Sequence, residues 1–188
     1  MICPVCGAHF CLDHLGIWWD PDKFDWQNCS GNLARFCFRY FNVWWDPNKY
    51  NWKRASIELA HYCSRYFDKW WDPDKFDWHS GSAALSIFCR NKFLIWWNPK
   101  KFNWNFGSPT LAKYCSRFFH IWWDPNKFNW QLGSRHLAKF CSKYFTTWWD
   151  VSKFDLDDIR YLNQYCQEYK HIWQEDVKLY KLLFGRQE

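Results

Sequence analysis

The N-terminal residues include the side chains best suited to binding a metal ion. Cys3 and Cys6 flank a Pro-Val pair and are followed by Gly7. Such a turn directs two thiolates to one metal ion, because backbone N–H groups can hydrogen-bond the sulfurs and glycine permits the tight geometry. Cys11 and His14 are three residues apart, so on a helix they share a face. We therefore predict a structural Zn²⁺ site with the ligands Cys3, Cys6, Cys11 and His14, which leaves no open position for a catalytic water.

Two other interpretations of this segment stay open. His9 is a substitute fourth ligand, or Cys11 belongs to a row of buried cysteines and the terminus binds no metal. Redox chemistry of the thioredoxin type is not expected, because the Cys-x-x-Cys motif there lies between a strand and a helix.

Cations recur at two regular places in the chain. One row consists of Lys23, Lys49, Lys75, Lys101, Lys127 and Lys153, and the second consists of Arg39, Arg65, Arg117 and Lys143. Two basic ridges flanked by exposed rings would bind a polyanion such as single-stranded nucleic acid. Alternatively, each Lys is neutralised by the Asp three residues before it or by nearby Asp and Asn residues.

Catalytic signatures are lacking in the sequence. The seven histidines are scattered, and no nucleophile elbow, phosphate-binding loop, dinucleotide fingerprint or zinc-protease motif occurs. We therefore expect a protein that is not an enzyme.

These residues are carried by a tandem repeat. A Trp-Trp pair begins at Trp18, Trp44, Trp70, Trp96, Trp122 and Trp148, always 26 residues apart. A fixed interval of this length is typical of a solenoid built from one small unit. We number the positions of each repeat from the first Trp of its pair.

Each repeat is predicted to be a pair of helices. Asp-Pro at positions 3 and 4 would begin a short first helix, which ends near the glycine at position 12. Serine at position 13 would cap a longer second helix, whose apolar residues recur at helical spacing. A strand over positions 6 to 9, as in Lys101–Trp104, is the alternative.

The ends of the array differ from its middle. Residues 1–17 would form an N-terminal cap with the zinc site and half a repeat, 18–147 five full repeats, and 148–188 a divergent sixth repeat with a closing helix. We therefore predict an all-α fold: a short solenoid of about six helix-pair repeats, with a half-repeat cap and a C-terminal capping helix.

Seven cysteines align at repeat position 20, the sixth repeat being one residue shorter before its cysteine. They are Cys11, Cys37, Cys63, Cys89, Cys115, Cys141 and Cys166. Packed helices lie about 8–10 Å apart, whereas a disulfide needs Cα atoms within roughly 7 Å. We predict a ladder of buried, reduced thiols. Such thiols, with no apolar run of membrane-spanning length and no secretory signal, indicate a cytoplasmic protein.

The composition is rich in aromatic residues, with 18 Trp, 10 Tyr and 18 Phe. Because the Trp-Trp pairs recur uniformly, we predict that they form a packing spine; an aromatic cage for a methylated cation is the alternative. The unit WWDPxKFNW…LAxYCxxxF resembles Trp-rich tandem arrays of unknown role. At the level of fold, the chain is similar to helix-pair solenoids such as the tetratricopeptide and Sel1-like families, although its repeat is shorter and lacks their signatures. The resemblance implies a helical solenoid and no activity.

Positions 10 to 12, 14, 15 and 18 vary among the repeats while the aromatic anchors hold. A variable surface on a constant core is typical of repeat proteins that bind other macromolecules. We expect a non-enzymatic interaction protein with a protein partner. Nucleic-acid binding along the basic ridges, and a purely structural or sequestering role, are the alternatives; the oligomeric state stays open.

We predict that purified protein contains about one zinc ion per chain. Elemental analysis after exhaustive dialysis measures the ratio, and Cys3→Ser with Cys6→Ser should remove the metal. Zinc well below one equivalent in the unchanged chain would refute the site.

Overall fold

The computed structural model describes residues 15–184, which are all-α, with no strand in that range. The prediction of a helical repeat fold is confirmed. The chain forms two compact units, unit 1 (Met1–Lys101) and unit 2 (Phe102–Glu188).

Each full repeat contains a long helix, a 3₁₀ helix and a four-residue helix. In unit 1 the long helices are α2 (Trp26–Phe36), α4 (Trp52–Tyr62) and α6 (Trp78–Phe88), and the short ones are α1 (Leu15–Trp18), α3 (Phe41–Trp44), α5 (Phe67–Trp70) and α7 (Phe93–Trp96). In unit 2 the order is α8 (Trp104–Tyr114), α9 (Phe119–Trp122), α10 (Trp130–Phe140), α11 (Phe145–Trp148), α12 (Ile159–Tyr165) and α13 (Lys170–Phe184). The 3₁₀ helices are η1 (Phe38–Tyr40), η2 (Ser64–Tyr66), η3 (Arg90–Lys92), η4 (Ser116–Phe118), η5 (Ser142–Tyr144), η6 (Leu156–Asp158) and η7 (Gln167–Tyr169).

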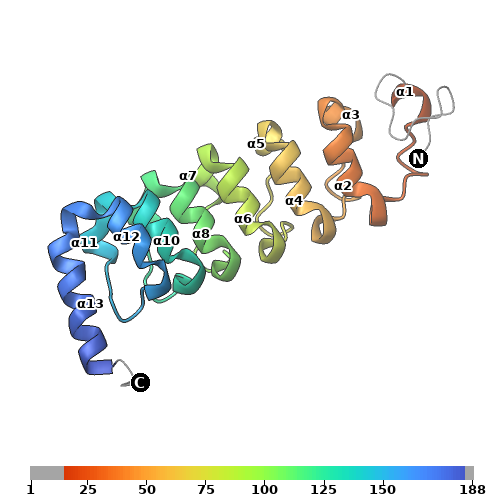
Figure 1. Cartoon of the computed structure of the whole chain (residues 1–188). Coiled ribbons are helices and arrows are strands. Elements are labelled where there is room, and N and C mark those ends of the chain that lie inside the picture. Colours follow the sequence, from red (N-terminus) through yellow and green to blue (C-terminus); the bar gives the residue numbers. More distant parts are fainter. Residues whose placement is uncertain (1–14, 185–188) are drawn as a thin grey trace. The chain divides into compact units, whose positions relative to one another are not determined.

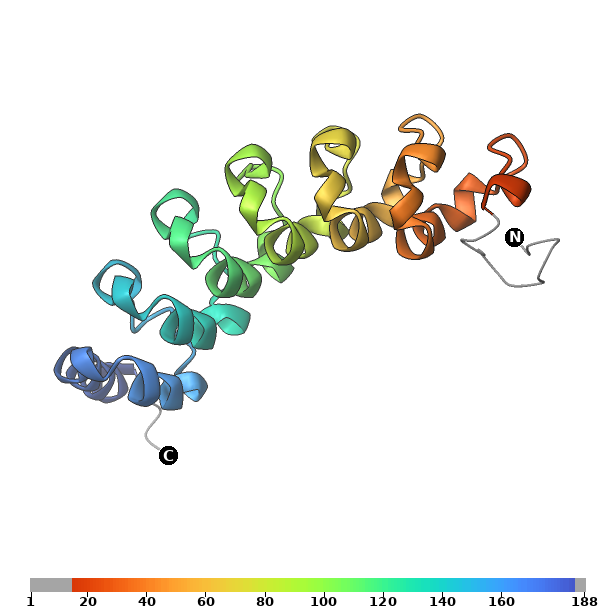
Figure 2. The same cartoon turned by 90° about the horizontal axis from the view of Figure 1, so that it is seen from above.

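The long helices of each unit pack on one another in sequence order. In unit 1, α2 contacts α4 and α4 contacts α6, while α3, α5 and α7 form a second row (Figure 1). In unit 2, α10 contacts both α8 and α12. Figure 2 shows the short helices of unit 1 set apart from the long ones.

The predicted start of the first helix is wrong. The residues after the Trp-Trp pair form a tight turn, in which the position-3 carboxylate accepts backbone N–H groups; Asp46 Oδ1 lies 2.9 Å from the Asn48 nitrogen. The long helix begins only at the position-9 Trp. Its N-cap is Asp or Asn at position 8, as where Asn51 accepts the N–H of Arg54 at 3.2 Å. The strand alternative is excluded over the same positions of the described repeats.

The predicted role of serine as an N-cap is also wrong. Ser56 lies inside α4, is buried, and donates its hydroxyl to the Trp52 carbonyl at 2.6 Å. The same oxygen accepts the backbone N–H of Asp77 in the next repeat at 3.0 Å. Ser30, Ser108 and Ser134 make the same pair of bonds. This serine joins neighbouring repeats rather than starting a helix.

The Trp-Trp pair forms the packing spine that its repetition predicts. The first Trp of each pair from Trp44 to Trp148 is 1% exposed. Its indole N–H donates to the carbonyl of the position-20 Cys, as from Trp70 to Cys63 at 2.8 Å. The Cys63 carbonyl also accepts the backbone N–H of Tyr66 at 2.9 Å, so the indole is its second donor. The tryptophan therefore supplies both buried apolar area and an additional hydrogen bond at the C-terminal end of the long helix.

Glycine at position 12 does not end a helix but lies inside one, beneath an aromatic ring. A Cβ atom added at Gly133 would lie 2.3 Å from the Phe128 ring, and Gly81 and Gly107 have the same environment. The second repeat has Ala55 at this position, where the backbone leaves helical geometry (φ −130°, ψ 15°). There Tyr50 replaces Phe and donates its hydroxyl to the Ala55 carbonyl at 2.9 Å.

The sixth repeat departs from the others as expected for the end of an array. Helix α12 has 7 residues instead of 11, and α13 has 15. Trp173 keeps the indole bond to the Cys166 carbonyl at 3.2 Å, and Asp176 of α13 accepts the indole N–H of Trp149 at 2.7 Å. Helix α13 thus covers residues of the last Trp-Trp pair.

We expect Gly133→Ala to lower the stability of the chain by about 1–3 kcal/mol, because the new methyl group overpacks against the Phe128 ring. The sign is opposite to the gain of about 0.5–1 kcal/mol that Ala usually brings to a helix interior. Thermal unfolding followed by circular dichroism measures the change.

Gly31→Ala is the matched control. Gly31 also lies inside a helix, α2, and a Cβ atom added there would lie 3.3 Å from the Glu58 side chain and 3.6 Å from the Ala55 side chain, with no ring beside it. In this control variant the midpoint temperature of unfolding should stay the same or rise. An equal loss in both variants would show that the ring contact is not the cause.

Candidate binding surface

The position-6 lysines join the turns of neighbouring repeats. Lys49 Nζ lies 2.7 Å from Asp22 Oδ1 and 3.4 Å from the Pro21 carbonyl. Lys101 makes the equivalent bonds to Asp74 and Pro73, at 2.6 and 2.9 Å. The hydrogen bond to Asp22 raises the pKa of Lys49.

The remaining lysines of this row also lie beside acceptors. Lys75 donates to Asn48 at 3.2 Å. Lys23, Lys127 and Lys153 pair with the position-3 Asp of their own repeats at 3.0, 3.4 and 3.8 Å. The predicted polyanion ridge therefore has acceptors along its whole length, as the neutralisation alternative expects. Binding of a polyanion there stays a prediction.

The second predicted row of cations lies in the 3₁₀ helices and contacts rings. The Arg65 guanidinium lies 4.9 Å from the Tyr66 ring centre and 5.1 Å from that of Phe38. Arg117 and Lys143 lie over Phe118 and Tyr144 at 4.5 and 4.7 Å. Arg39 is exposed at the corresponding position of η1.

The two rows of cations do not come together. The position-6 lysines precede the long helix and the position-22 cations follow it. An 11-residue helix is about 16 Å long. The rows are therefore separate features rather than one basic site.

The variable positions, by contrast, lie on the solvent-exposed side of the long helices. Positions 10, 11, 14, 15 and 18 line a groove in unit 1, and positions 14, 15 and 18 also line a groove in unit 2. Position 12 differs from the rest of the predicted set, because Gly81, Gly107 and Gly133 are buried inside helices, although Ala55 contributes to the unit 1 groove.

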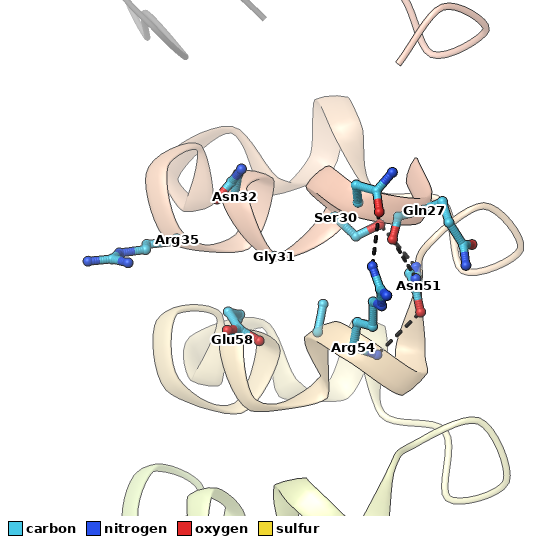
Figure 3. A pocket seen from close by; sticks show the side chains of 10 residues that line it. Gln27, Ser30, Gly31, Asn32, Arg35, Asn51, Arg54 and Glu58 are labelled. Carbon is cyan, nitrogen blue, oxygen red and sulfur yellow. Dashed lines mark hydrogen bonds between the residues drawn. The ribbon is translucent and has the colours of Figure 1, made fainter. Parts of the chain in front are cut away.

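The unit 1 groove lies between α2 and α4 and has a volume of about 350 Å³ (Figure 3). Its wall is polar: Arg54 donates to Asn28 Oδ1 at 2.9 Å, and Asn51 donates to the Gln27 carbonyl at 2.6 Å. Glu58 lies against Gly31, and its Oε2 atom is buried without a hydrogen-bond partner. Guanidinium, amide and carboxylate groups thus face one small space.

The unit 2 groove lies along α10, between α8 and α12, and is basic. It is lined by Lys113, Arg135, His136, Lys139, Phe140 and Tyr161, and its volume is about 140 Å³. The three lysine and arginine side chains are exposed, and none belongs to an ion pair of the described residues. We call this set of residues the basic groove.

His136 has the most unusual environment in the basic groove. Its Nδ1 atom is buried and has no hydrogen-bond partner. Burial lowers the pKa of the imidazole, and the Arg135 and Lys113 charges lower it further, against the opposing effects of the Leu132 carbonyl and Asp158. His136 is therefore neutral at pH 7.

The sequence predicted positions 15 and 18 as part of a variable surface but did not single out Glu58 or His136. Both occupy position 15. The available signal was the appearance of an ionisable residue where other repeats have Asn, Ala or Thr. That these side chains turn toward the neighbouring long helix depends on packing that the repeat pattern does not reveal.

The predicted zinc ligands Cys3, Cys6, Cys11 and His14 lie outside the described residues, so the zinc site stays a prediction. Among residues 15–184, no group of three or more His, Cys, Asp or Glu side chains is placed to hold a metal ion.

The predicted thiol ladder is confirmed for its six described members. Cys37, Cys63, Cys89, Cys115, Cys141 and Cys166 are buried thiols outside any disulfide. Cys63 donates its thiol to the Ala34 carbonyl of the preceding repeat at 3.7 Å, and Cys89 bonds to Ala60 at 3.6 Å. Burial raises the pKa of Cys63 and Cys89 to about 12. These thiols act as packed donors and are not nucleophiles at neutral pH.

We predict that the thiols of Cys63, Cys89, Cys141 and Cys166 resist alkylation in the folded chain at pH 8. With a pKa near 12, the thiolate fraction is roughly 10³-fold below that of a thiol with a pKa of 9.0. Peptide mass spectrometry after iodoacetamide treatment measures each site, with half-buried Cys29 as the internal comparison. All five should react equally in guanidinium chloride.

The same raised pKa values make stability depend on pH. The unfolded thiols lose their protons above pH 9.0 while the folded thiols keep theirs. The contribution of the thiols to the free energy of unfolding is therefore complete below pH 9.0 and declines toward pH 12.

Alkylation of Cys63 as fast as Cys29 in the folded chain would contradict the packed ladder.

No helix of residues 15–184 has the length and apolar character needed to span a membrane. Comparisons of the chain with protein-family models, curated proteins and solved structures find no match.

Proposed function

We propose that this chain is a non-enzymatic repeat protein that binds another protein through the solvent-exposed side of its long helices. The distribution of constant and variable residues carries the proposal. Position-13 serines, position-20 cysteines and the first Trp of each pair are buried in bonds within and between repeats. The variable positions line the two grooves, so they can change without disturbing those bonds.

The chemistry of the grooves fits a protein surface. The unit 1 groove presents charged and amide groups beside aliphatic carbon, and the basic groove presents charged groups beside aromatic carbon. Such mixtures are typical of interfaces between proteins. Exposed apolar side chains add contact area on the same helices, for example Ile57 at 40% and Leu132 at 44% exposure.

Nucleic-acid binding is the second candidate, favoured by the exposed cations of the basic groove. It predicts an affinity for labelled oligonucleotides that falls steeply as salt rises. A purely structural or sequestering role would show no preferred face. The N-terminal zinc ion remains part of the proposal as a cap on the array, and reduced thiols fit a cytoplasmic setting.

The proposal is tested by site-specific photocrosslinking in native cells. A photoreactive amino acid at Ile57 in α4 or Gln131 in α10 samples the variable side of each unit, and Thr147 in α11 is the exposed control on a short helix. We expect discrete adducts from Ile57 or Gln131, and none from Thr147. Protease should remove the adducts and nuclease should not.

Equal adducts from all three sites would show that the long helices are not a preferred binding side. Adducts that nuclease removes would favour the nucleic-acid candidate instead.

A further inference from the structure

The basic groove concentrates positive charge without a matching carboxylate. Lys113 belongs to α8, Arg135 and Lys139 belong to α10, and Arg160 of α12 lies beside the groove residue Tyr161. Asp158 lies at its edge, where its Oδ2 atom accepts the backbone N–H of Arg135 at 3.2 Å. The three cations that line the groove form no ion pair among the described residues, and a bound anion would relieve their mutual repulsion.

The floor of the groove offers an unused polar atom beside aromatic carbon. The His136 ring lies nearly parallel to Phe140, with ring centres 6.2 Å apart. Its buried Nδ1 atom has no partner, and such atoms in native proteins usually bind a ligand or water. A neutral imidazole presents Nδ1 either as a donor or as an acceptor. A peptide satisfies both forms, because it has backbone N–H and C=O groups, whereas sulfate offers acceptors only.

The size and the rings of the groove favour a peptide over a nucleic acid. A volume of about 140 Å³ is well below the roughly 300–1,000 Å³ of small-molecule pockets, so it suits one side chain rather than a nucleotide. Lys139 already lies over the Phe140 and Tyr165 rings at 5.4 and 5.5 Å. Arg160 lies over Tyr161 at 5.2 Å. The ring faces on which bases would stack are therefore partly covered.

We propose that the basic groove binds an acidic peptide segment, with a Glu or Asp carboxylate held by Lys113, Arg135 and Lys139 and the adjoining peptide backbone at His136. This inference rests on the proposed protein-binding function and names the chemistry of the partner.

The test uses the full chain and a short fluorescent peptide of alternating Glu and Gly. Anisotropy gives its affinity for the unchanged chain, for Lys113→Gln with Lys139→Gln, and for Lys53→Gln with Lys100→Gln. The second pair removes the same charge from exposed positions of unit 1. We expect the groove pair to weaken binding by at least ~10-fold, as for loss of charge-assisted hydrogen bonds, and the control pair to change it less than ~2-fold.

His136→Phe supplies a second variant that keeps the ring and the charge of its neighbours. It should weaken binding of the peptide but not of sulfate used as a competitor, because only the peptide backbone engages Nδ1 in both of its forms. Circular dichroism verifies that each variant is folded.

Four results would overturn the inference. Three of them are equal weakening by both lysine pairs, competition by sulfate as effective as that by the unlabelled peptide, and single-stranded DNA of equal charge binding the groove more tightly than the peptide. The fourth is absence of peptide binding. The proposed function is judged separately, because crosslinking from Ile57 in unit 1 does not involve this groove.

Discussion

Each repeat leaves hydrogen-bonding and aromatic groups that only its neighbour satisfies, and this mutual dependence underlies the rest of the structure. Ser56 inside α4 accepts the N–H of Asp77 that precedes α6. Cys89 donates to the Ala60 carbonyl one repeat earlier. Phe119 stacks on Tyr144 of the following repeat, with ring centres 4.5 Å apart. Hydrogen bonds contribute about 1 kcal/mol each and aromatic pairs about 0.5–1.5 kcal/mol, so stability accumulates from one interface to the next.

This dependence explains why so many residues are constant. The buried serine, thiol and indole all bond to backbone groups, which every residue supplies. Replacing the serine would leave the backbone N–H of the next repeat without its acceptor, and an unpaired buried polar group costs about 1–3 kcal/mol. The lysines belong to the same scheme at the surface, where Lys101 joins its own turn to Asp74. The regular pattern of cations thus has a structural explanation, and the basic groove, which does not repeat, needs another.

The period and composition were enough to predict the helical repeat, the buried tryptophans and the ladder of thiols. The residues at which the helices begin were not predictable, because Asp-Pro and Ser are also preferred at helix N-termini but here lie elsewhere, in a turn and inside a helix. Specific contacts place these residues inside the long helix. The Phe128 ring occupies the space beside Gly133, and the Ser134 hydroxyl donates to the Trp130 carbonyl and accepts the Asp155 N–H. Neither contact follows from spacing along the chain. For the same reason the variable surface was predicted as a set of positions, while its grooves and the inward turn of position 12 were not.

Position 15 is where this scaffold can acquire a binding site at little cost to its core. The buried side-chain atoms without hydrogen-bond partners in residues 15–184 are Glu58 Oε2 and His136 Nδ1, and both belong to this position. Leu59 and Leu137, the next residues along the chain, are fully buried and do not change with them. Glu58 places a carboxylate among amides and guanidinium groups, whereas His136 lies beside three cations and two aromatic rings. Because the bonds between repeats use other positions, a change at position 15 alters the charge of a groove and leaves the array intact. Duplication of the unit followed by substitution at this position would therefore produce grooves of different specificity on one constant core.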